Sequence, residues 1–252
     1  MDHLTVVKDY WDRRSHGFSD AVVEELYSYK GDEWREFFRT ELGEGPFKIL
    51  DDGAGAGFFT MILSALGHRV TAVDYSEGMV ERIISNLGER GLEAAALRMD
   101  AQALSFEDGS FDAVVQRDVL WNLDDPARAV SEVYRVLRPG GKYIIKDGNH
   151  YLSANDEEFA EASRKRREKW AQQAREKGPS PGDHNAHNPE NVDYTVIERI
   201  AVEQPLSHVR RPQWDVDTLI RCGFSEIRLK LEGSPFPYSY IIVAVKPEKE
   251  SI

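Results

Sequence analysis

The chain has 252 residues, enough to bury a substantial core as one large domain or as a domain with an insertion. Its formal net charge of −12 disfavours RNA or DNA as a substrate, because a phosphate backbone attracts clustered lysines and arginines. Cys222 is the single cysteine and allows no internal disulfide, and no secretory signal is recognisable. No apolar run approaches the ~18 residues needed to cross a bilayer, so we expect a cytoplasmic protein that does not bind membranes.

The N-terminal part of the chain has the apolar spacing of helices. This periodicity covers residues 4–42, and polar stretches interrupt it at Ser15–Gly17 and Gly31-Asp32. We therefore expect two helices, forming an N-terminal cap within residues 1–44.

Strands and helices then alternate, which is typical of a parallel sheet covered by helices on both faces. Strands are predicted at 47–52, 69–74, 93–99, 111–116 and 142–147, and helices at 57–66, 77–90 and 126–138. We interpret Arg138-Pro139-Gly140-Gly141 as a structural turn, because proline ends the preceding helix and the paired glycines reverse the chain.

The alternation stops at residue 151. Residues 151–210 contain a charged helix from about 155 to 176, a loop rich in glycine, proline, asparagine and histidine, and a weaker helix at 192–202. A long loop without structure is uncommon in a compact domain, so we expect an insertion that covers the carboxyl end of the sheet. Residues 211–252 would add a helix at 213–222 and two closing strands, at 225–231 and 238–246.

A glycine-rich turn is the most informative motif of the chain. A short apolar strand runs into Asp51-Asp52 and then into Gly53, Gly55 and Gly57. Glycine permits positive φ and close approach of the backbone, so a ligand is expected at the start of the following helix. The spacing does not fit a dinucleotide fingerprint, because Phe and Thr occupy positions where glycines would be needed. Asp74 ends the second strand, where a carboxylate typically holds a ribose diol.

These segments resemble class I S-adenosylmethionine-dependent methyltransferases over roughly residues 45–150. The resemblance rests on ILDDGAGAGFF, VTAVDYSEGMV, MDAQALSFEDGSFDAVV, and the block from Leu120 to Pro139 with the glycine pair after it. A narrower resemblance is to a bacterial and archaeal subgroup of small-molecule methyltransferases. It rests on YWD at 10–12, Arg117 with WNL at 121–123, and RPQWD at 211–215.

The resemblance implies an α/β, Rossmann-like, doubly wound sheet of seven strands with an antiparallel last strand, in one methyltransferase domain spanning 1–252. Its cofactor-binding core would be 45–150. The cofactor would be S-adenosyl-L-methionine, the product S-adenosyl-L-homocysteine, and the enzyme class EC 2.1.1. Cofactor contacts are expected from Asp51, Gly53, Gly55, Gly57, Asp74, Tyr75, Asp100, Ala101, Gln116, Tyr10 and Trp11.

Several of these cofactor residues have structural alternatives. Asp51 and Asp100 are also suited to capping or turn roles. Tyr10 and Trp11, which in relatives close over the cofactor, also fit a helix packing stripe. Met79 on a helix is more often a core residue.

Residues after strands four and five are the candidates for catalysis and substrate binding, because ligands of open parallel sheets bind at this edge. Arg117 would either grip a substrate carboxylate or pair with a neighbouring aspartate. Trp121 would either face a cation or cover the next helix. His150 is the best-placed general base, with a surface-loop histidine as the alternative. We expect catalytic roles for His150, Arg117 and Asn149, and substrate contacts from Trp121, Asn122, Asp147, His184 and His187.

We expect no metal, because His184 and His187 lie in a loop without cysteine or helical support. The leading hypothesis is methyl transfer to an N, O, C or S atom of a small polar metabolite by a monomer or homodimer. The alternatives are a cofactor-binding regulatory module and non-methyl chemistry with a nucleotide-like cofactor.

Overall fold

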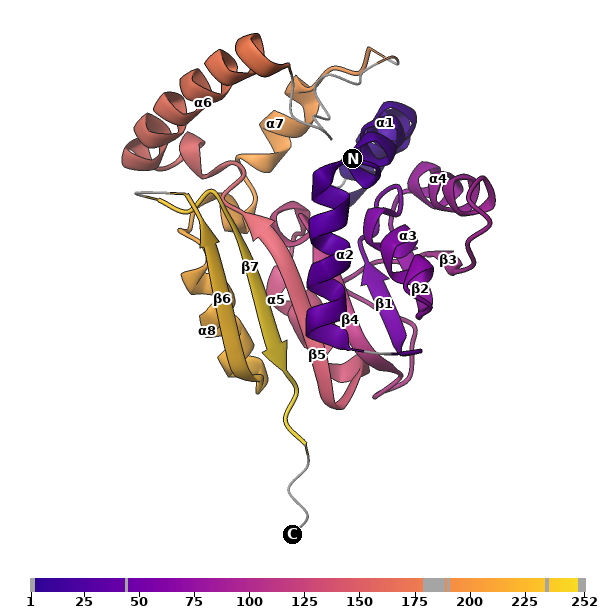
Figure 1. Ribbon diagram of the computed structural model, residues 1–252. Helices are drawn as coiled ribbons and strands as arrows, with labels where there is room; N and C mark the ends of the chain where they lie inside the picture. The colour runs from indigo at the N-terminus through magenta and orange to yellow at the C-terminus, as the bar shows by residue number, and fades with distance from the viewer. Residues whose placement is uncertain (1–2, 44, 179–188, 190, 234–235, 249–252) are drawn as a thin grey trace.

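The computed structural model describes most of the chain and contains one seven-stranded sheet, in the order β3-β2-β1-β4-β5-β7-β6 (Figure 1). The described residues are 3–43, 45–178, 189, 191–233 and 236–248. The strands are β1 Lys48–Asp52, β2 Arg69–Asp74, β3 Ala95–Arg98, β4 Phe111–Arg117, β5 Leu137–Gly148, β6 Ser225–Glu232 and β7 Ser239–Val245. β1 to β5 pair in parallel and β7 pairs antiparallel with both neighbours, which confirms the predicted doubly wound sheet.

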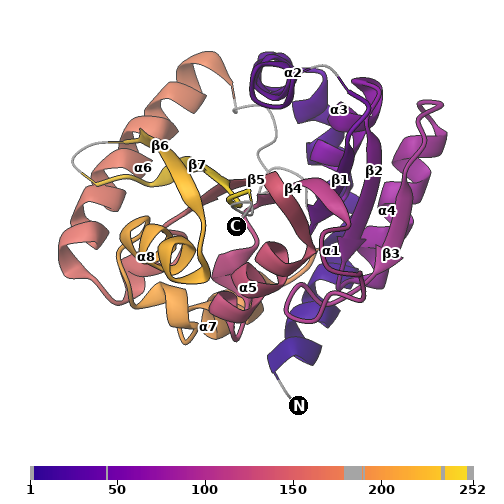
Figure 2. The same ribbon diagram turned by 90° about the horizontal axis from the view of Figure 1, so that it is seen from below.

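Helices cover both faces of this sheet (Figure 2). They are α1 His3–Leu26, α2 Tyr29–Leu42, α3 Phe58–Ala65, α4 Glu77–Gly88, α5 Pro126–Val136, α6 Glu157–Lys177, α7 Thr195–Ala201 and α8 Gln213–Cys222. Successive strand residues point to opposite faces, so neighbours such as Val114 and Val115 enter different cores. α5 and α8 pack on one core, and α1 to α4 on the other.

The two N-terminal helices are separated at a different place from the predicted one. α1 continues through Ser15–Gly17, and the break lies at Tyr27-Ser28, where Ser28 Oγ accepts a hydrogen bond from Lys30 N. Gly31 lies inside α2, and a Cβ there would lie 2.1 Å from the carbonyl oxygen of Leu26. Gly31 is therefore needed for the close packing of α2 on the end of α1, and it does not break the helix.

Arg138-Pro139-Gly140-Gly141 is also different from its prediction as a separate turn. α5 ends at Val136 and β5 begins at once, so the motif forms the irregular start of the strand. Gly140 has a φ of +74°, and the register with β4 shifts at this point. Gly140 N donates to Lys246 O, and Lys246 N donates to Gly141 O, so the glycines are paired with the chain after β7.

The described residues of the segment 151–210 lie over the edge at which β1, β4 and β5 end, as Figure 1 shows for α6 and α7. Its helix α7 joins the N-terminal helix in a third apolar cluster, formed by Val7, Tyr10, Trp121, Ile197 and Ala201. The expected position of the insertion is thus confirmed for its described residues. None of the described helices combines the length and the hydropathy needed to span a membrane.

Candidate active site

A cavity of about 860 Å³ lies at the carboxyl edge of the sheet, within the size range of small-molecule sites. Loops after β1, β2, β3, β4 and β5 form its floor, and α1 and α7 contribute its outer walls. The predicted site residues on its wall are Tyr10, Trp11, Asp51, Gly53, Gly55, Asp74, Tyr75, Asp100, Ala101, Arg117, Trp121, Asn122 and His150. Gly57, Gln116, Asp147 and Asn149 are not on the wall, and His184 and His187 lie outside the described residues.

The glycine turn packs between α1 and the segment after β4. Gly53 and Gly55 both have positive φ, of +71° and +54°. A Cβ on Gly53 would lie 2.5 Å from Val119, and one on Gly55 would lie 3.0 Å from the ring of Phe18. Side chains at these two positions would therefore collide, whereas glycine lets the backbone pass. Gly57 instead precedes the first residue of α3 and has a φ of +88°.

Asp74 connects the glycine turn to the start of α4. Its Oδ2 accepts a hydrogen bond from Gly55 N at 2.8 Å, and its Oδ1 accepts one from Ser76 N at 2.9 Å. Burial raises the pKa of Asp74 to about 6, although these hydrogen bonds oppose the increase. A carboxylate has about four lone-pair sites, so the two backbone donors orient it and still leave sites for hydroxyl groups.

Asp51 and Asp52 point to opposite faces of β1, as the strand alternation predicts. Asp51 Oδ2 accepts a hydrogen bond from Thr60 Oγ1 at 2.5 Å, and Asp52 Oδ2 accepts one from Gln116 Nε2 at 2.6 Å. Burial raises the pKa of each carboxyl group to about 7. Gln116 supports Asp52 from behind the wall, and it also accepts a hydrogen bond from the hydroxyl of Tyr143.

One oxygen of the Asp51-Asp52 pair has no partner. Asp52 is fully buried on the cavity wall, and its Oδ1 accepts no hydrogen bond from any described residue. A buried acceptor without a donor costs roughly 1–3 kcal/mol. The carboxylate acceptors of this region therefore fit a ligand that donates hydrogen bonds from an ammonium or hydroxyl group.

The adenine-edge candidates follow β3. Asp100 and Ala101 lie on the cavity wall, and Asp100 Oδ1 accepts hydrogen bonds from the backbone and the side-chain amide of Gln102. Met79 also reaches the wall, but it is 2% exposed and packs in the core beneath α1 to α4.

Asp12 fastens α1 over the cofactor side of the cavity. Its Oδ1 accepts hydrogen bonds from Ser76 Oγ at 2.6 Å and from Gly78 N at 3.0 Å, at the start of α4. A carboxylate is favourable there because the N-terminus of a helix carries partial positive charge. The contact brings Trp11 and Phe18 to the cavity wall. In the sequence, the only sign of this role is that Asp12 directly follows two aromatic site candidates, Tyr10 and Trp11.

The opposite half of the cavity has an aromatic wall. Tyr10 and Trp121 are 5% and 8% exposed, and Tyr151 and Tyr194 line the same space. The ring of Trp121 lies 5.3 Å from that of Tyr151 and 5.3 Å from that of His150. Sequence reasoning missed Tyr151 and Tyr194, because aromatic residues in an irregular segment give no periodic pattern.

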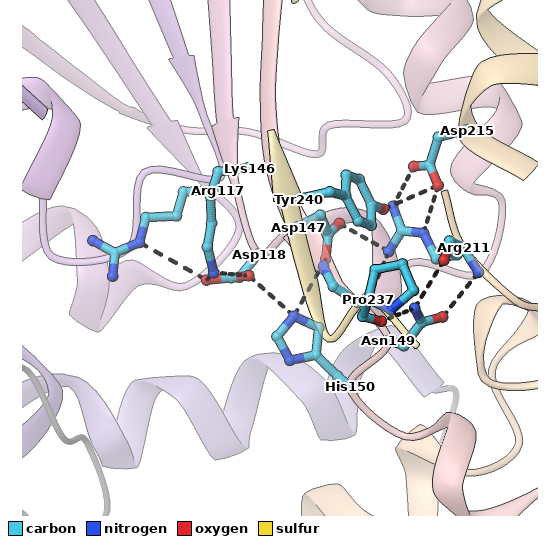
Figure 3. A network of polar contacts seen from close by, with 11 residues as sticks. Arg117, Asp118, Lys146, Asp147, Asn149, His150, Arg211, Asp215, Pro237 and Tyr240 are labelled. Atoms are coloured by element: carbon cyan, nitrogen blue, oxygen red, sulfur yellow. Dashed lines mark hydrogen bonds and ion pairs between the residues drawn. The ribbon is translucent and has the colours of Figure 1, made fainter. Parts of the chain in front are cut away.

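His150 lies at the edge of this wall, between two carboxylates (Figure 3). Its Nε2 lies 3.0 Å from Asp118 Oδ1 and 3.3 Å from Asp147 Oδ1. Burial lowers the pKa of His150, but the hydrogen bonds to Asp118 and Asp147 outweigh it and raise the pKa to about 9. The imidazole of the ligand-free protein is therefore protonated at neutral pH.

Both carboxylates are themselves held by cations. Lys146 Nζ lies 2.8 Å from each oxygen of Asp118, a residue with the left-handed φ of +56°. Arg211 lies 3.0 Å from Asp147 and is fully buried. The resulting network of alternating charges runs from the end of β4 to the start of α8, as Figure 3 shows.

Arg117 and Asn149 both bind other parts of the protein. Arg117 donates to both carboxylate oxygens of Glu25, at 2.9 and 2.7 Å, and lies 3.8 Å from Asp118. Asn149 donates to the carbonyl oxygens of Arg211 and Pro237 and accepts from Arg211 N. These contacts favour structural roles for both residues and argue against the predicted catalytic role of Asn149.

Asp118, Asp147 and His150 bring three potential metal ligands within 4.8 Å of one another, and no other such group occurs among the described residues. Lys146 and Arg211 already neutralise the two carboxylates and would compete with an ion. Asp147 supports His150 from behind the wall, so its predicted substrate contact is not favoured by its position. The expectation that the protein needs no metal stays a prediction.

The sheet order, the glycine turn and the acid after β2 define a doubly wound α/β protein that binds a nucleotide-like ligand at the carboxyl edge of its strands. Residues 50–145 match a family model described as a methyltransferase domain. This part of the chain is therefore a class I S-adenosylmethionine-dependent methyltransferase domain, a class whose cofactor is S-adenosylmethionine.

Curated relatives match the same region. A demethylmenaquinone methyltransferase of Thermus thermophilus is 38% identical over 106 residues, which cover 41% of this chain and 48% of the relative. A ubiquinone biosynthesis O-methyltransferase of Caulobacter sp. is 34% identical over 122 residues, which cover 47% of this chain and 48% of the relative. The chain thus spans about half the length of the curated relatives it matches.

Solved structures share the fold over most of the chain. A SAM-dependent methyltransferase from Aquifex aeolicus matches with a TM-score of 0.53 and 20% identity, over 84% of this chain and 89% of that one. A phosphoethanolamine N-methyltransferase 2 from Haemonchus contortus, in complex with S-adenosyl-L-methionine, matches with a TM-score of 0.63 and 16% identity, over 96% of this chain and 60% of that one. At these identities the likeness establishes the fold alone.

Proposed function

We propose that the protein transfers a methyl group from S-adenosylmethionine to a small-molecule acceptor bound beneath α1 and α7. The observation that carries this proposal is one cavity with two different halves. Its cofactor half has the glycine turn and Asp74, and its other half has an ionisable side chain, His150, against an aromatic wall. A module that only bound the cofactor would not need an ionisable group on the second wall.

The cofactor half would hold S-adenosylmethionine through complementary groups. Backbone amides of the glycine turn would approach it closely, Asp74 would bind the ribose hydroxyls, and Asp100 with Ala101 would bind the adenine edge. The free oxygen of Asp52 and the nearby carboxylate of Asp51 suit the amino group. When bound, S-adenosylmethionine supplies a methyl carbon on positively charged sulfur, a good leaving group.

His150 would handle the proton of the acceptor. Its Nε2 faces Asp118 and Asp147, so Nδ1 is the ring nitrogen that remains for an acceptor. A second positive charge in the cavity lowers the pKa of an imidazolium, because like charges disfavour the charged form. The neutral imidazole formed in this way accepts a proton on Nδ1, and the two carboxylates stabilise the product imidazolium.

The acceptor was expected to be a small polar metabolite held by Arg117, Asn149 and His150. Arg117 pairs with Glu25 and the amide of Asn149 binds the backbone, whereas His150 keeps one ring nitrogen for the acceptor, and the wall around His150 is aromatic. We therefore propose an acceptor with an apolar ring and a polar reacting group. The net charge of −12 supports a small molecule in preference to nucleic acid.

Calorimetric titration tests the cofactor assignment. We expect S-adenosylmethionine and S-adenosylhomocysteine to bind, and Asp74→Ala to weaken binding by about 1.5–3 kcal/mol, or roughly 10- to 150-fold, the scale of hydrogen bonds to a charged group. Asp108→Ala is the matched control, because the Asp108 side chain is 80% exposed and lies off the cavity wall. Binding of NAD without binding of either methionine-derived ligand would refute the proposal.

A further inference from the structure

Trp121 lines the acceptor half of the cavity and carries an unsatisfied donor. It lies in the short helix Leu120–Asn122 after β4 and is 8% exposed on the cavity wall. Its indole Nε1 has no hydrogen-bond partner among the described residues. An indole nitrogen only donates, so the atom that satisfies it must be an acceptor, such as an oxygen.

His150 brings a second polar group to the same place. The rings of Trp121 and His150 are 5.3 Å apart, so one small group of a ligand can contact both. Figure 3 shows the imidazole with one nitrogen turned to Asp118 and Asp147 and the other pointing away from them. The network thereby leaves one ring nitrogen of His150 without a carboxylate partner, in a ring that lies 5.3 Å from that of Trp121.

The surrounding surface suits a flat apolar ring. Tyr10 comes from α1, Tyr151 follows His150, and Tyr194 precedes α7. Val7 and Ile197 fill the space between them. Aromatic rings pack against one another at centroid distances of roughly 4.5–7 Å, so this wall offers stacking and edge contacts.

We propose that the acceptor is a hydroxylated aromatic compound whose phenolic oxygen receives the indole N–H of Trp121 and lies against the imidazole of His150. This inference rests on the proposed function and names its substrate class. A phenol meets both requirements of the wall, because its ring is apolar and its oxygen is both an acceptor and weakly acidic.

Two cationic side chains lie at the acceptor end of the cavity, Arg14 and the protonated His150. Arg14 is 1% exposed, lines the cavity and lies 5.1 Å from the centre of the Tyr194 ring. The charged groups around His150 come from several elements: Arg117 on β4, Asp118 after it, Lys146 and Asp147 on β5, and Arg211 before α8. Glu198 on α7 is a further acid of the wall. Positive charge near a phenolic oxygen favours its ionised form, and Arg14 and the imidazolium of His150 both line this cavity.

Methyl transfer to a phenol involves one proton transfer, one bond formed and one bond broken. The hydroxyl gives its proton to Nδ1 of neutral His150, and a lone pair of the oxygen forms the bond to the methyl carbon. The carbon–sulfur bond breaks, and its electron pair stays on sulfur. The products are an aryl methyl ether, a neutral thioether and an imidazolium held by Asp118 and Asp147.

The test uses 4-nitrophenol as the probe, with the protein saturated with S-adenosylhomocysteine. Absorbance reports whether the bound phenol is ionised, and calorimetry reports its affinity. We expect the bound probe to ionise at a pH at least about one unit lower than in solution, since positive charge and hydrogen-bond donors favour the phenolate. Trp121→Phe keeps a ring and removes the N–H, so it should weaken probe binding about five- to tenfold, the scale of one hydrogen bond.

Trp170→Phe is the control for the substitution. Trp170 lies on α6, is 45% exposed and packs on Tyr238 away from the cavity wall, so probe binding should not change. Equal probe affinity in Trp121→Phe and the wild type, or tighter binding of phenyltrimethylammonium than of 4-nitrophenol, would overturn the inference. Failure of S-adenosylhomocysteine itself to bind would instead refute the proposed function, and the inference with it.

Discussion

Arg211→Ala is expected to lower the free energy of unfolding by about 3–5 kcal/mol, because it leaves two buried carboxylates without their cation. The Arg211 side chain is fully buried, and its guanidinium lies 3.0 Å from Asp147 and 2.5 Å from Asp215. Arg211 also donates to the carbonyl oxygen of Gly148. These partners belong to β5 and α8, so Arg211 connects the two elements.

Urea unfolding followed by circular dichroism measures this change, and the preceding residue supplies a matched control. Arg210 pairs with Asp156 and Glu158, but its side chain is 46% exposed. Exposed ion pairs contribute about 0–1 kcal/mol, so Arg210→Ala should have a small effect. Similar losses in the two variants would show that the buried pair is not an important source of stability.

His150→Gln is expected to lower the rate of methyl transfer by about 10²- to 10⁴-fold, the usual contribution of a positioned proton acceptor. Glutamine keeps a hydrogen-bonding side chain but cannot take up a proton at neutral pH. Affinity for S-adenosylhomocysteine should change little, because the cofactor residues lie on the other half of the cavity. The measurements are turnover with an accepted phenol and calorimetry with S-adenosylhomocysteine.

His208→Gln is the control, since His208 is an exposed residue off the cavity wall. Turnover of His150→Gln within twofold of the wild type would show that positioning alone carries the reaction. A parallel loss of cofactor affinity would assign His150 a structural role.

The same substitution should also change how stability depends on pH. The folded pKa of His150 is raised from 6.5 to about 9, so the folded protein binds this proton more tightly than the unfolded chain. The stabilisation is complete below pH 6.5 and is lost as the pH rises through about 9. Melting temperatures of the ligand-free wild type should therefore fall over this interval more steeply than those of His150→Gln. Parallel curves would contradict the raised pKa.

Local patterns predicted the parts of the site that depend on short stretches of chain. Period-two alternation placed Asp51 and Asp52 on opposite faces of β1, and the apolar run of β2 ended at Asp74 as expected. The glycine spacing located the turn, because positive φ and close contacts act on single positions. These features depend on neighbouring residues in the sequence, so the sequence alone predicts them.

Such local patterns could not predict pairs of residues that lie far apart in the sequence. Arg117 donates to Glu25, 92 residues earlier, and Asn149 binds the backbone of Arg211, 62 residues later. No local spacing links these residues, so the sequence left two equally good interpretations of Arg117 and gave no sign of the contacts of Asn149. The motif RPQWD was noticed, but the role of Arg211 follows only from the fold that brings it to Asp147.

The attachment of α1 has a thermodynamic consequence for the order in which ligands bind. This helix contributes Trp11 to the cofactor half and Tyr10 to the acceptor half, and Asp12 fastens it beside Asp74 through Ser76. A ligand that orders the turn around Asp74 therefore also fixes the wall that receives the acceptor. Such coupling is reciprocal, so each ligand should tighten the binding of the other by the same factor, which paired titrations would measure. Product inhibition would then be strongest when methylated acceptor and S-adenosylhomocysteine accumulate together.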